Sequence, residues 1–119
     1  MQPDKESKVM FTDFNLLGQW FAAMDSGRMH DFSLNEAISF MVNCDTQEEI
    51  DYYWEKLSEG GQTSQCGWLK DRFGLSWQVV PSILGELMSG KDPATSQRVV
   101  QAMMQMTKFD IEKLKKAAE

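Results

Sequence analysis

Residues 35–44 alternate between two faces in the manner of a β-strand. The first face carries Ile38, Phe40 and Val42. The second face carries Ala37, Ser39 and Met41. Because both faces are partly apolar, the pattern predicts a strand that is covered on one side and lines a cavity on the other.

A helix is predicted from Thr46 to Ser58. The Thr46 side chain can cap the first turn, and Glu49 three residues later completes a capping box. Apolar residues at helical spacing form one stripe, which consists of Ile50, Tyr53, Trp54 and Leu57. The two glycines at 60–61 end the helix. We therefore expect this helix to pack on a sheet through that stripe.

Two further strands are predicted at about Ser64–Lys70 and Leu75–Val80, joined by a turn at 71–74. In the second of these strands, alternation directs Trp77 and Val79 toward the helix. The alternate positions, which we expect to face the cavity, are Ser76, Gln78 and Val80. The order of elements predicted for 35–81, a strand, a helix and two short strands, indicates a module of the βαβββ type.

The flanking segments are predicted to be a hairpin and a group of helices. A strand-like run from Lys8, a turn at residues 17–18 and a second run at Gln19–Met24 indicate a β-hairpin. Beyond Pro81, helices are expected at residues 82–88, from Asp92-Pro93 to about Met106, and from about Asp110.

The predicted fold class is α+β, with a mixed or mostly antiparallel sheet of about five or six strands. Residues 1–7 are polar and are expected to be a disordered end. Residues 8–81 are expected to form one domain, which contains the hairpin at 8–24 and the βαβββ module at 35–81. Residues 82–119 are expected to form a helical C-terminal extension.

Charge and composition exclude several classes of partner. The 119-residue chain has a net charge of −6 and a pI near 4.7, which argues against nucleic acid or an anionic membrane. It contains no signal-peptide pattern and no run of about 18 apolar residues, so a cytoplasmic location is expected. Cys44 and Cys66 lack a CxxC spacing, and we expect them to be reduced.

Three segments of the chain carry a resemblance to a known family. Together they extend over most of residues 8–119, and they read NEAISFMVNCDTQEEIDYYWEKLSEGG, QCGWLKDRFGLSWQVVP and KDPATSQRVVQAMMQM. They resemble PhnB-like proteins of the glyoxalase/bleomycin-resistance (vicinal oxygen chelate) superfamily. Some members carry the label 3-demethylubiquinone 3-methyltransferase. This chain has no Gly-rich loop after a leading strand of the kind that cradles S-adenosylmethionine.

The resemblance implies a cup built from two βαβββ modules. The second module is whole here, but of the first only the hairpin is present, so one chain is not expected to close the cup alone. In metal-dependent relatives, His or Glu side chains on the first and last strands of each module bind a metal. The matching positions are Ala22 or Ala23, Ala37 and Gln78. Alanine cannot ligate and glutamine offers a neutral carbonyl oxygen, so we expect no metal and no cofactor.

The candidate substrate-binding residues are cavity-facing or hairpin side chains, namely Gln78, Trp68, Trp20, Ser39, Met41 and Ser76. Gln78 is interpreted either as a hydrogen-bond partner of a ligand or as a half-exposed strand amide. Trp68 and Trp20 are interpreted either as stacking surfaces for a ligand or as core residues. No catalytic residue is identified.

Two other side chains have both a chemical and a plain structural interpretation. Cys66, expected on the same face as Trp68, is either a nucleophile or an inert buried thiol. His30, the single histidine, lies beside Asp31 and is either half of an acid–base pair or a solvated loop residue. The structural interpretation is preferred for both.

Two functions from different classes follow from these observations. The first is a small-molecule-binding protein or metal-independent enzyme of the superfamily, with a ligand that the sequence does not identify. The alternative is a non-catalytic, dimeric interaction module without a working active site. A homodimer is expected because the strand at 35–44 has an unpaired edge, and its residues from Ala37 to Val42 include no charge or proline. The competing interpretation is that the hairpin at 8–24 folds back over this edge and leaves a monomer. A second apolar surface for the same contact is expected from Val99, Val100, Met103, Met104 and Met106.

Overall fold

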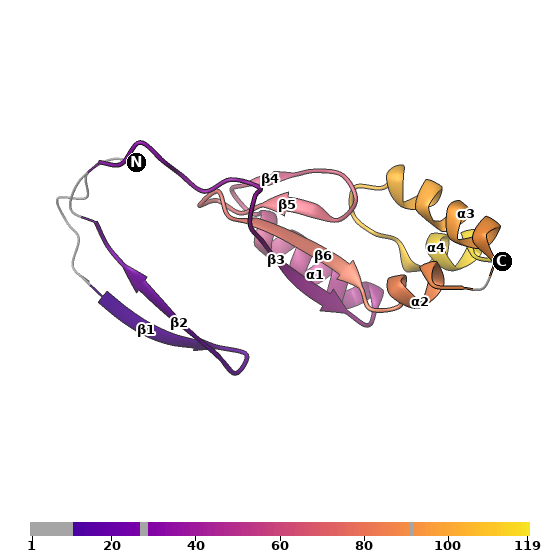
Figure 1. Cartoon of the computed structure of the whole chain (residues 1–119), viewed down its shortest axis with the longest axis horizontal. Helices are drawn as coiled ribbons and strands as arrows, with labels where there is room; N and C mark the ends of the chain where they lie inside the picture. Colours follow the sequence, from indigo (N-terminus) through magenta and orange to yellow (C-terminus); the bar gives the residue numbers. More distant parts are fainter. Residues whose placement is uncertain (1–10, 27–28, 91) are drawn as a thin grey trace. The chain divides into compact units, whose positions relative to one another are not determined.

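The computed structural model describes residues 11–26, 29–90 and 92–119. The chain divides into two compact units, of which the first ends at Ser33 and the second extends from Leu34 to Glu119. Over the described residues, six strands and four helices are present (Figure 1). The predicted disordered end and the first residues of the predicted hairpin lie outside the described ranges.

The first unit contains the predicted hairpin. Strand β1 (Phe11–Leu16) pairs in antiparallel register with β2 (Gln19–Met24). The turn between them has positive φ at both central residues, Leu17 and Gly18, which matches the twist of the paired strands. The Asn15 side chain accepts a hydrogen bond from the Gly18 N–H at 2.9 Å and closes the turn.

The second unit is built on a four-stranded mixed sheet with the order β3-β6-β5-β4. Its strands are β3 (Ser39–Cys44), β4 (Gln62–Thr63), β5 (Trp68–Lys70) and β6 (Ser76–Pro81). β3 is parallel to β6, and the other neighbours are antiparallel. With helix α1 between β3 and β4, this order confirms the α+β class and the βαβββ module. The strands form two sheets, whereas the sequence pattern predicted one sheet of five or six strands.

The first strand of the module is shorter than predicted. β3 begins at Ser39, not at residue 35. The Asn35 side chain accepts a hydrogen bond from the Ala37 N–H at 2.9 Å, and this Asx turn takes residues 35–37 out of the extended conformation. Ala37 therefore precedes the strand.

The prediction of one strand at residues 64–70 is wrong. The chain reverses there, so that β4 and β5 form a small antiparallel hairpin. The reversal depends on Cys66 and Gly67, which have φ of 56° and 79°. Their N–H groups donate to the carbonyl oxygens of Met106 and Thr107, each at 2.8 Å. These bonds to a distant segment hold the turn in a left-handed conformation.

Helix α1 (Gln47–Ser58) begins as predicted, because Thr46 Oγ1 accepts the Glu49 N–H at 3.1 Å. The Glu49 carboxylate in turn accepts the N–H of Asp45 at 3.0 Å, one residue earlier than in a standard capping box. Ile50 is buried, and Trp54 and Leu57 pack against the core. Tyr53, which was predicted to belong to the same stripe, is less buried, with 39% of its surface exposed.

The C-terminal helices belong to the same core as the sheet. They are α2 (Leu84–Met88), α3 (Pro93–Met104) and α4 (Ile111–Ala117). The buried apolar residues form one cluster, which consists of Cys44, Ile50, Leu69, Val79, Leu84, Val99, Phe109, Ile111 and Leu114. Val99 is therefore part of this core and does not contribute to an exposed apolar surface, contrary to the expectation from sequence. α3 is capped by Asp92 as predicted, and it ends two residues before Met106.

The contact between the module and the C-terminal segment is close. A Cβ atom at Gly67 would lie 2.6 Å from the Phe109 ring and 2.7 Å from the Val79 carbonyl oxygen, so only glycine fits. The Gln47 side chain donates to the Phe109 carbonyl and accepts from the Ile111 N–H, each at 2.9 Å. The segment that leads into α4 is therefore fixed to both β5 and α1.

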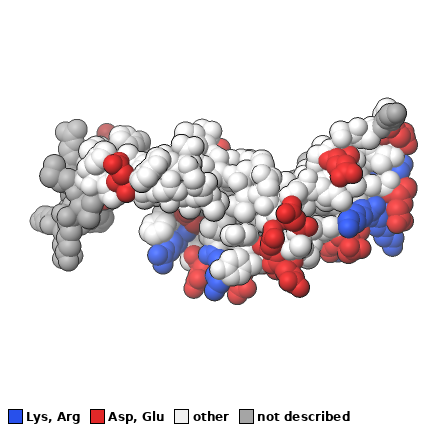
Figure 2. Space-filling model, turned by 90° about the horizontal axis from the view of Figure 1, so that it is seen from below, with Lys and Arg blue, Asp and Glu red and all other residues white. Residues whose placement is uncertain are grey.

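No helix in the described part of the chain is long and apolar enough to cross a membrane. Aspartate and glutamate side chains form several clusters on the face of the second unit shown in Figure 2. Lysine and arginine side chains lie between these clusters, in keeping with the net charge of −6.

Candidate functional site

The four-stranded sheet has one face packed against α1 and a second face that we call the open face. Leu69, Val79 and Cys44 are buried on the α1 side. Because side chains alternate along a strand, the residues between them point to the open face. Strand register arranges these residues in two rows across β3, β6 and β5, the first Ser39–Ser76–Lys70 and the second Met41–Gln78–Trp68.

The two rows differ in chemistry. The first row contains two hydroxyls and an ammonium group, and the second contains a thioether, an amide and an indole. Gln78 Nε2 donates to Ser39 Oγ at 2.9 Å, which links the rows and fixes the Gln78 amide. Met41 is 54% exposed. The open face therefore offers a polar strip beside a more apolar strip.

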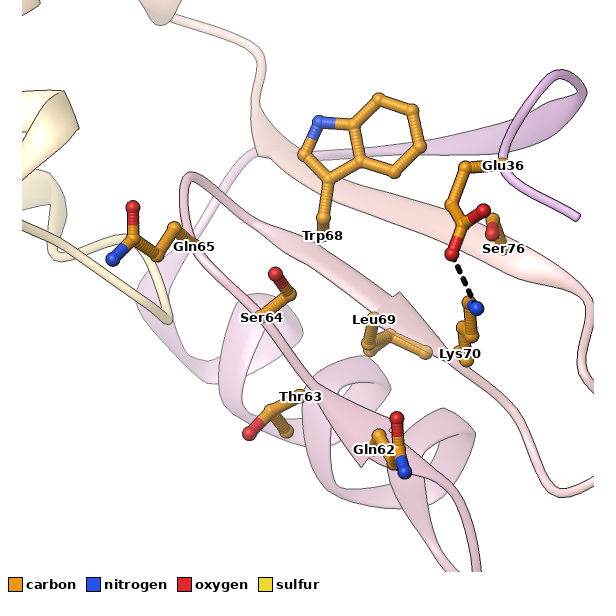
Figure 3. Close-up of a pocket in the computed structure, with 9 residues that line it drawn as sticks. All are labelled: Glu36, Gln62, Thr63, Ser64, Gln65, Trp68, Leu69, Lys70 and Ser76. Carbon is orange, nitrogen blue, oxygen red and sulfur yellow. Dashed lines mark ion pairs between the residues drawn. The ribbon is translucent and has the colours of Figure 1, made fainter.

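A pocket of about 410 Å³ lies over one end of these rows (Figure 3). It is lined by Glu36, Gln62, Thr63, Ser64, Gln65, Trp68, Leu69, Lys70 and Ser76. Glu36 forms an ion pair with Lys70, shown as a dashed line in Figure 3. The hydrogen bond and charge of Lys70 lower the pKa of the Glu36 carboxyl. Ser76 is fully buried, and its hydroxyl has no hydrogen-bond partner among the described residues.

The turn before β6 determines which residues of that strand lie on the open face. Asp71 Oδ1 accepts the N–H groups of Phe73 and Leu75 at 2.8 and 3.0 Å. Asp71 Oδ2 accepts the indole N–H of Trp77 at 2.9 Å. This carboxylate fixes Trp77 on the α1 side of β6, and alternation then places Ser76 and Gln78 on the open face.

Comparison with known proteins places this arrangement in a family. Residues 1–80 match the model of a family described as 3-demethylubiquinone-9 3-methyltransferase. The chain belongs to this family. Among solved structures, a PhnB protein from Bacillus cereus is 37% identical, with a TM-score of 0.61 over 67% of this chain and 70% of that chain. A search of curated proteins found no match.

The structure of this PhnB-like chain brings together five of the six predicted substrate-binding residues. Ser39, Met41, Trp68, Ser76 and Gln78 all lie in the two rows of the open face. The sixth residue, Trp20, lies on β2 of the hairpin in the first unit and is 67% exposed.

The positions that match metal ligands of the superfamily are distributed over different elements. Ala22 and Ala23 lie on β2, Ala37 lies in the turn before β3, and Gln78 lies on β6. Across the described ranges, no three His, Cys, Asp or Glu side chains gather into a group that could hold a metal ion. The open face of this PhnB-like chain instead carries neutral hydrogen-bonding groups and one ion pair.

The placement predicted for Cys66 is wrong. It lies in the turn before β5, and its thiol faces α3, with Sγ 3.5 Å from the Met103 carbonyl oxygen. Cys66 is therefore not on the face that carries Trp68. His30 is held in its loop by a 2.6 Å hydrogen bond between its Nε2 and Ser26 Oγ, and its ring stacks on Phe32.

The pocket residues that the sequence interpretation missed include both charged ones, Lys70 and Glu36. Lys70 lies two residues after Trp68 on β5, so period-two alternation alone places both on one face. Glu36 lies in the turn before β3, and only the fold places it beside Lys70. Of the two, Lys70 was the one with a local signal.

Proposed function

We propose that this PhnB-like protein binds a small molecule on the open face of its βαβββ module. The observation that supports this proposal most strongly is the pair of side-chain rows on this face. The hydrogen bond from Gln78 to Ser39 links the two rows. A binding site needs a few fixed polar groups beside an apolar surface, and the rows provide both.

The direction of the Gln78–Ser39 bond defines what the site can offer. Gln78 uses Nε2 as a donor to Ser39, and its carbonyl oxygen stays available as an acceptor. Ser39 accepts this bond and keeps its hydroxyl proton for a ligand. Trp68 and Met41 flank these groups and supply contact area.

The proposal does not include methyl transfer, although the family description names that reaction. A methyl donor such as S-adenosylmethionine is typically held by a glycine-rich turn between a strand and a helix. The corresponding turn here, Cys44 to Thr46, contains no glycine. Its helix N-terminus is already capped by Thr46, and Glu48 and Glu49 lie in the first turn of α1. These residues do not fit such a cofactor.

A screen of small metabolites by thermal shift, followed by NMR, tests the binding proposal. A ligand that binds only the folded state raises the melting temperature. We expect the hits to perturb the Gln78 side-chain amide and the Trp68 indole N–H. Gln78→Leu should weaken such binding, whereas Tyr52→Phe on the exposed side of α1 should not. Hits that stabilise the Gln78→Leu variant as strongly as the original protein would contradict the proposal.

We also propose that the working unit is a homodimer, the assembly expected for the alternative function as an interaction module. β3 is an edge strand of the four-stranded sheet, and within the described residues it pairs only with β6. Ile38, immediately before β3, is 69% exposed. An uncharged strand edge of this kind tends to pair with another chain, and two copies can do so around a twofold axis.

A further inference from the structure

The Ser76 hydroxyl is the most unusual group in the pocket. It is fully buried, it lines the pocket, and it has no partner among the described residues. A buried hydroxyl without a hydrogen bond destabilises the fold, and most buried polar groups in proteins are paired. The hydroxyl is therefore suited to donate to an acceptor atom that enters the pocket.

Lys70 provides a positive charge beside this hydroxyl. It is the direct cross-strand neighbour of Ser76, so their side chains lie side by side on the open face. Its ammonium group is paired with Glu36, and the two side chains are 38% and 59% exposed. Exposed ion pairs of this kind contribute little to stability, so another anion can take the place of the Glu36 carboxylate.

The second row, which contains Trp68, determines the chemistry of the rest of the ligand. Trp68 is two residues from Lys70 along β5, which corresponds to a separation of about 7 Å. A molecule with an anionic group at Lys70 therefore extends its body over the Trp68 indole. An indole favours a flat or apolar partner.

The charges near the pocket also limit the charge of the ligand. Lys70 is the single cation among the pocket-lining residues, and Glu36 lies next to it. The chain as a whole carries a net charge of −6. A group with one negative charge matches this environment better than a phosphate dianion.

We propose that the open face binds a small aromatic carboxylate, whose carboxylate displaces Glu36 from Lys70 and accepts a hydrogen bond from Ser76. This inference rests on the proposed binding function and specifies its ligand class. The flat body of the ligand lies over Trp68. Glu36 then acts as an internal competitor that occupies Lys70 when the site holds no ligand.

NMR titration with a matched pair of probes tests this proposal. Indole-3-carboxylate and indole-3-carboxamide have the same shape and differ in charge, and inorganic phosphate serves as a second anion. The ligand carboxylate accepts a hydrogen bond from the buried Ser76 hydroxyl in addition to its exposed ion pair with Lys70, and a hydrogen bond to a charged group is worth about 1.5–3 kcal/mol. We therefore expect the carboxylate to bind about tenfold or more tightly than the carboxamide. Phosphate should bind more weakly than the carboxylate.

Four variants assign the preference to individual side chains. Lys70→Met should remove the preference for the carboxylate, and Glu36→Gln should strengthen carboxylate binding without changing carboxamide binding. Ser76→Ala should weaken carboxylate binding without lowering the melting temperature, because the hydroxyl has no partner in the fold. Lys113→Met, a change of an exposed lysine on α4, should leave both affinities unchanged.

The outcomes separate the ligand class from the binding function itself. Equal affinity for both probes, with shifts at Trp68 and Gln78, would overturn the carboxylate preference and retain the binding function. A lower melting temperature of Ser76→Ala would overturn the role of the hydroxyl. If neither probe shifts these signals, the aromatic-carboxylate proposal fails, and the thermal-shift screen of other metabolites then decides whether the open face binds a small molecule at all.

Discussion

Asp71 accepts a hydrogen bond from the indole N–H of Trp77 across the turn that joins β5 to β6. The same carboxylate accepts two backbone N–H groups within that turn. One side chain thus determines the shape of the turn and the rotation of the following strand. The open face depends on this rotation, because Ser76 and Gln78 flank Trp77 on β6.

Asp71→Asn is expected to destabilise the fold by about 1–3 kcal/mol. An amide cannot provide two acceptor oxygens, so at least one donor loses its partner. The urea unfolding midpoint measures the change. The matched control is Asp110→Asn at the N-cap of α4, where asparagine caps as well as aspartate and little change is expected. Equal midpoints for Asp71→Asn and the original protein would show that the carboxylate is dispensable.

Gln47→Glu is expected to loosen the attachment of the C-terminal segment. The glutamine donates to the Phe109 carbonyl and accepts from the Ile111 N–H. A carboxylate cannot donate, and it would lie near Asp51, which Gln47 also contacts at 3.1 Å. We expect a loss of about 1–3 kcal/mol and faster hydrogen exchange at the Ile111 amide. Gln101→Glu, at an exposed position of α3, adds the same charge and should have no such effect.

The two cysteines are expected to differ in reactivity. Burial, with smaller effects of Glu49 and Asp45, raises the pKa of the Cys44 thiol to about 11. Because the thiolate is the nucleophile, iodoacetamide at about pH 8 should alkylate the half-buried Cys66 before Cys44 in the folded protein. Peptide mass spectrometry identifies the modified residue. Preferential labelling of Cys44 would contradict the burial seen here.

The Cys44 thiol also predicts a loss of stability in alkali. Below about pH 9 it is protonated in both the folded and the unfolded state, and above that pH the unfolded state ionises first. The free energy of unfolding should therefore fall as pH rises from about 9 to 11, by about 1.4 kcal/mol for each unit of pKa difference. A Cys66→Ser background isolates this effect. Adding Cys44→Ala should reduce the slope, and an unchanged slope would refute the assignment.

The dimer proposal predicts a mass near twice 13.6 kDa by light scattering at micromolar concentration. Ile38→Lys places a charge beside the edge of β3 and should shift the protein toward the monomer. Ile38→Val keeps the position apolar and should leave the dimer intact. A mass near 13.6 kDa for the unaltered protein would exclude the dimer.

Elements with strong local signals could be predicted from sequence. Helix α1 has a cap at Thr46 and an apolar stripe that includes Ile50, and both are confirmed. The two-residue turn at Leu17-Gly18 and the Asp92-Pro93 helix start are also local features, and they lie where the pattern placed them.

The turn at Cys66 could not be predicted, because its cause is distant in sequence. A non-glycine residue with positive φ is uncommon, and here Met106 and Thr107 supply the bonds that hold it. The candidate site likewise combines features that local patterns predict with features that depend on the tertiary fold. Alternation along β6 predicted that Ser76 and Gln78 share a face, whereas the ion pair of Glu36 with Lys70 requires the folded loop before β3.

The parallel pairing of β3 with β6 has a consequence for how the protein is made. β3 leaves the ribosome before its partner, because α1, β4 and β5 are all synthesised between them. During that interval its apolar segment has no intramolecular ladder to join, whereas α1 and the β4–β5 hairpin can form from local contacts. We expect β3 to be the segment most exposed to aggregation during synthesis, and the completion of β6 to be the step that ends this exposure.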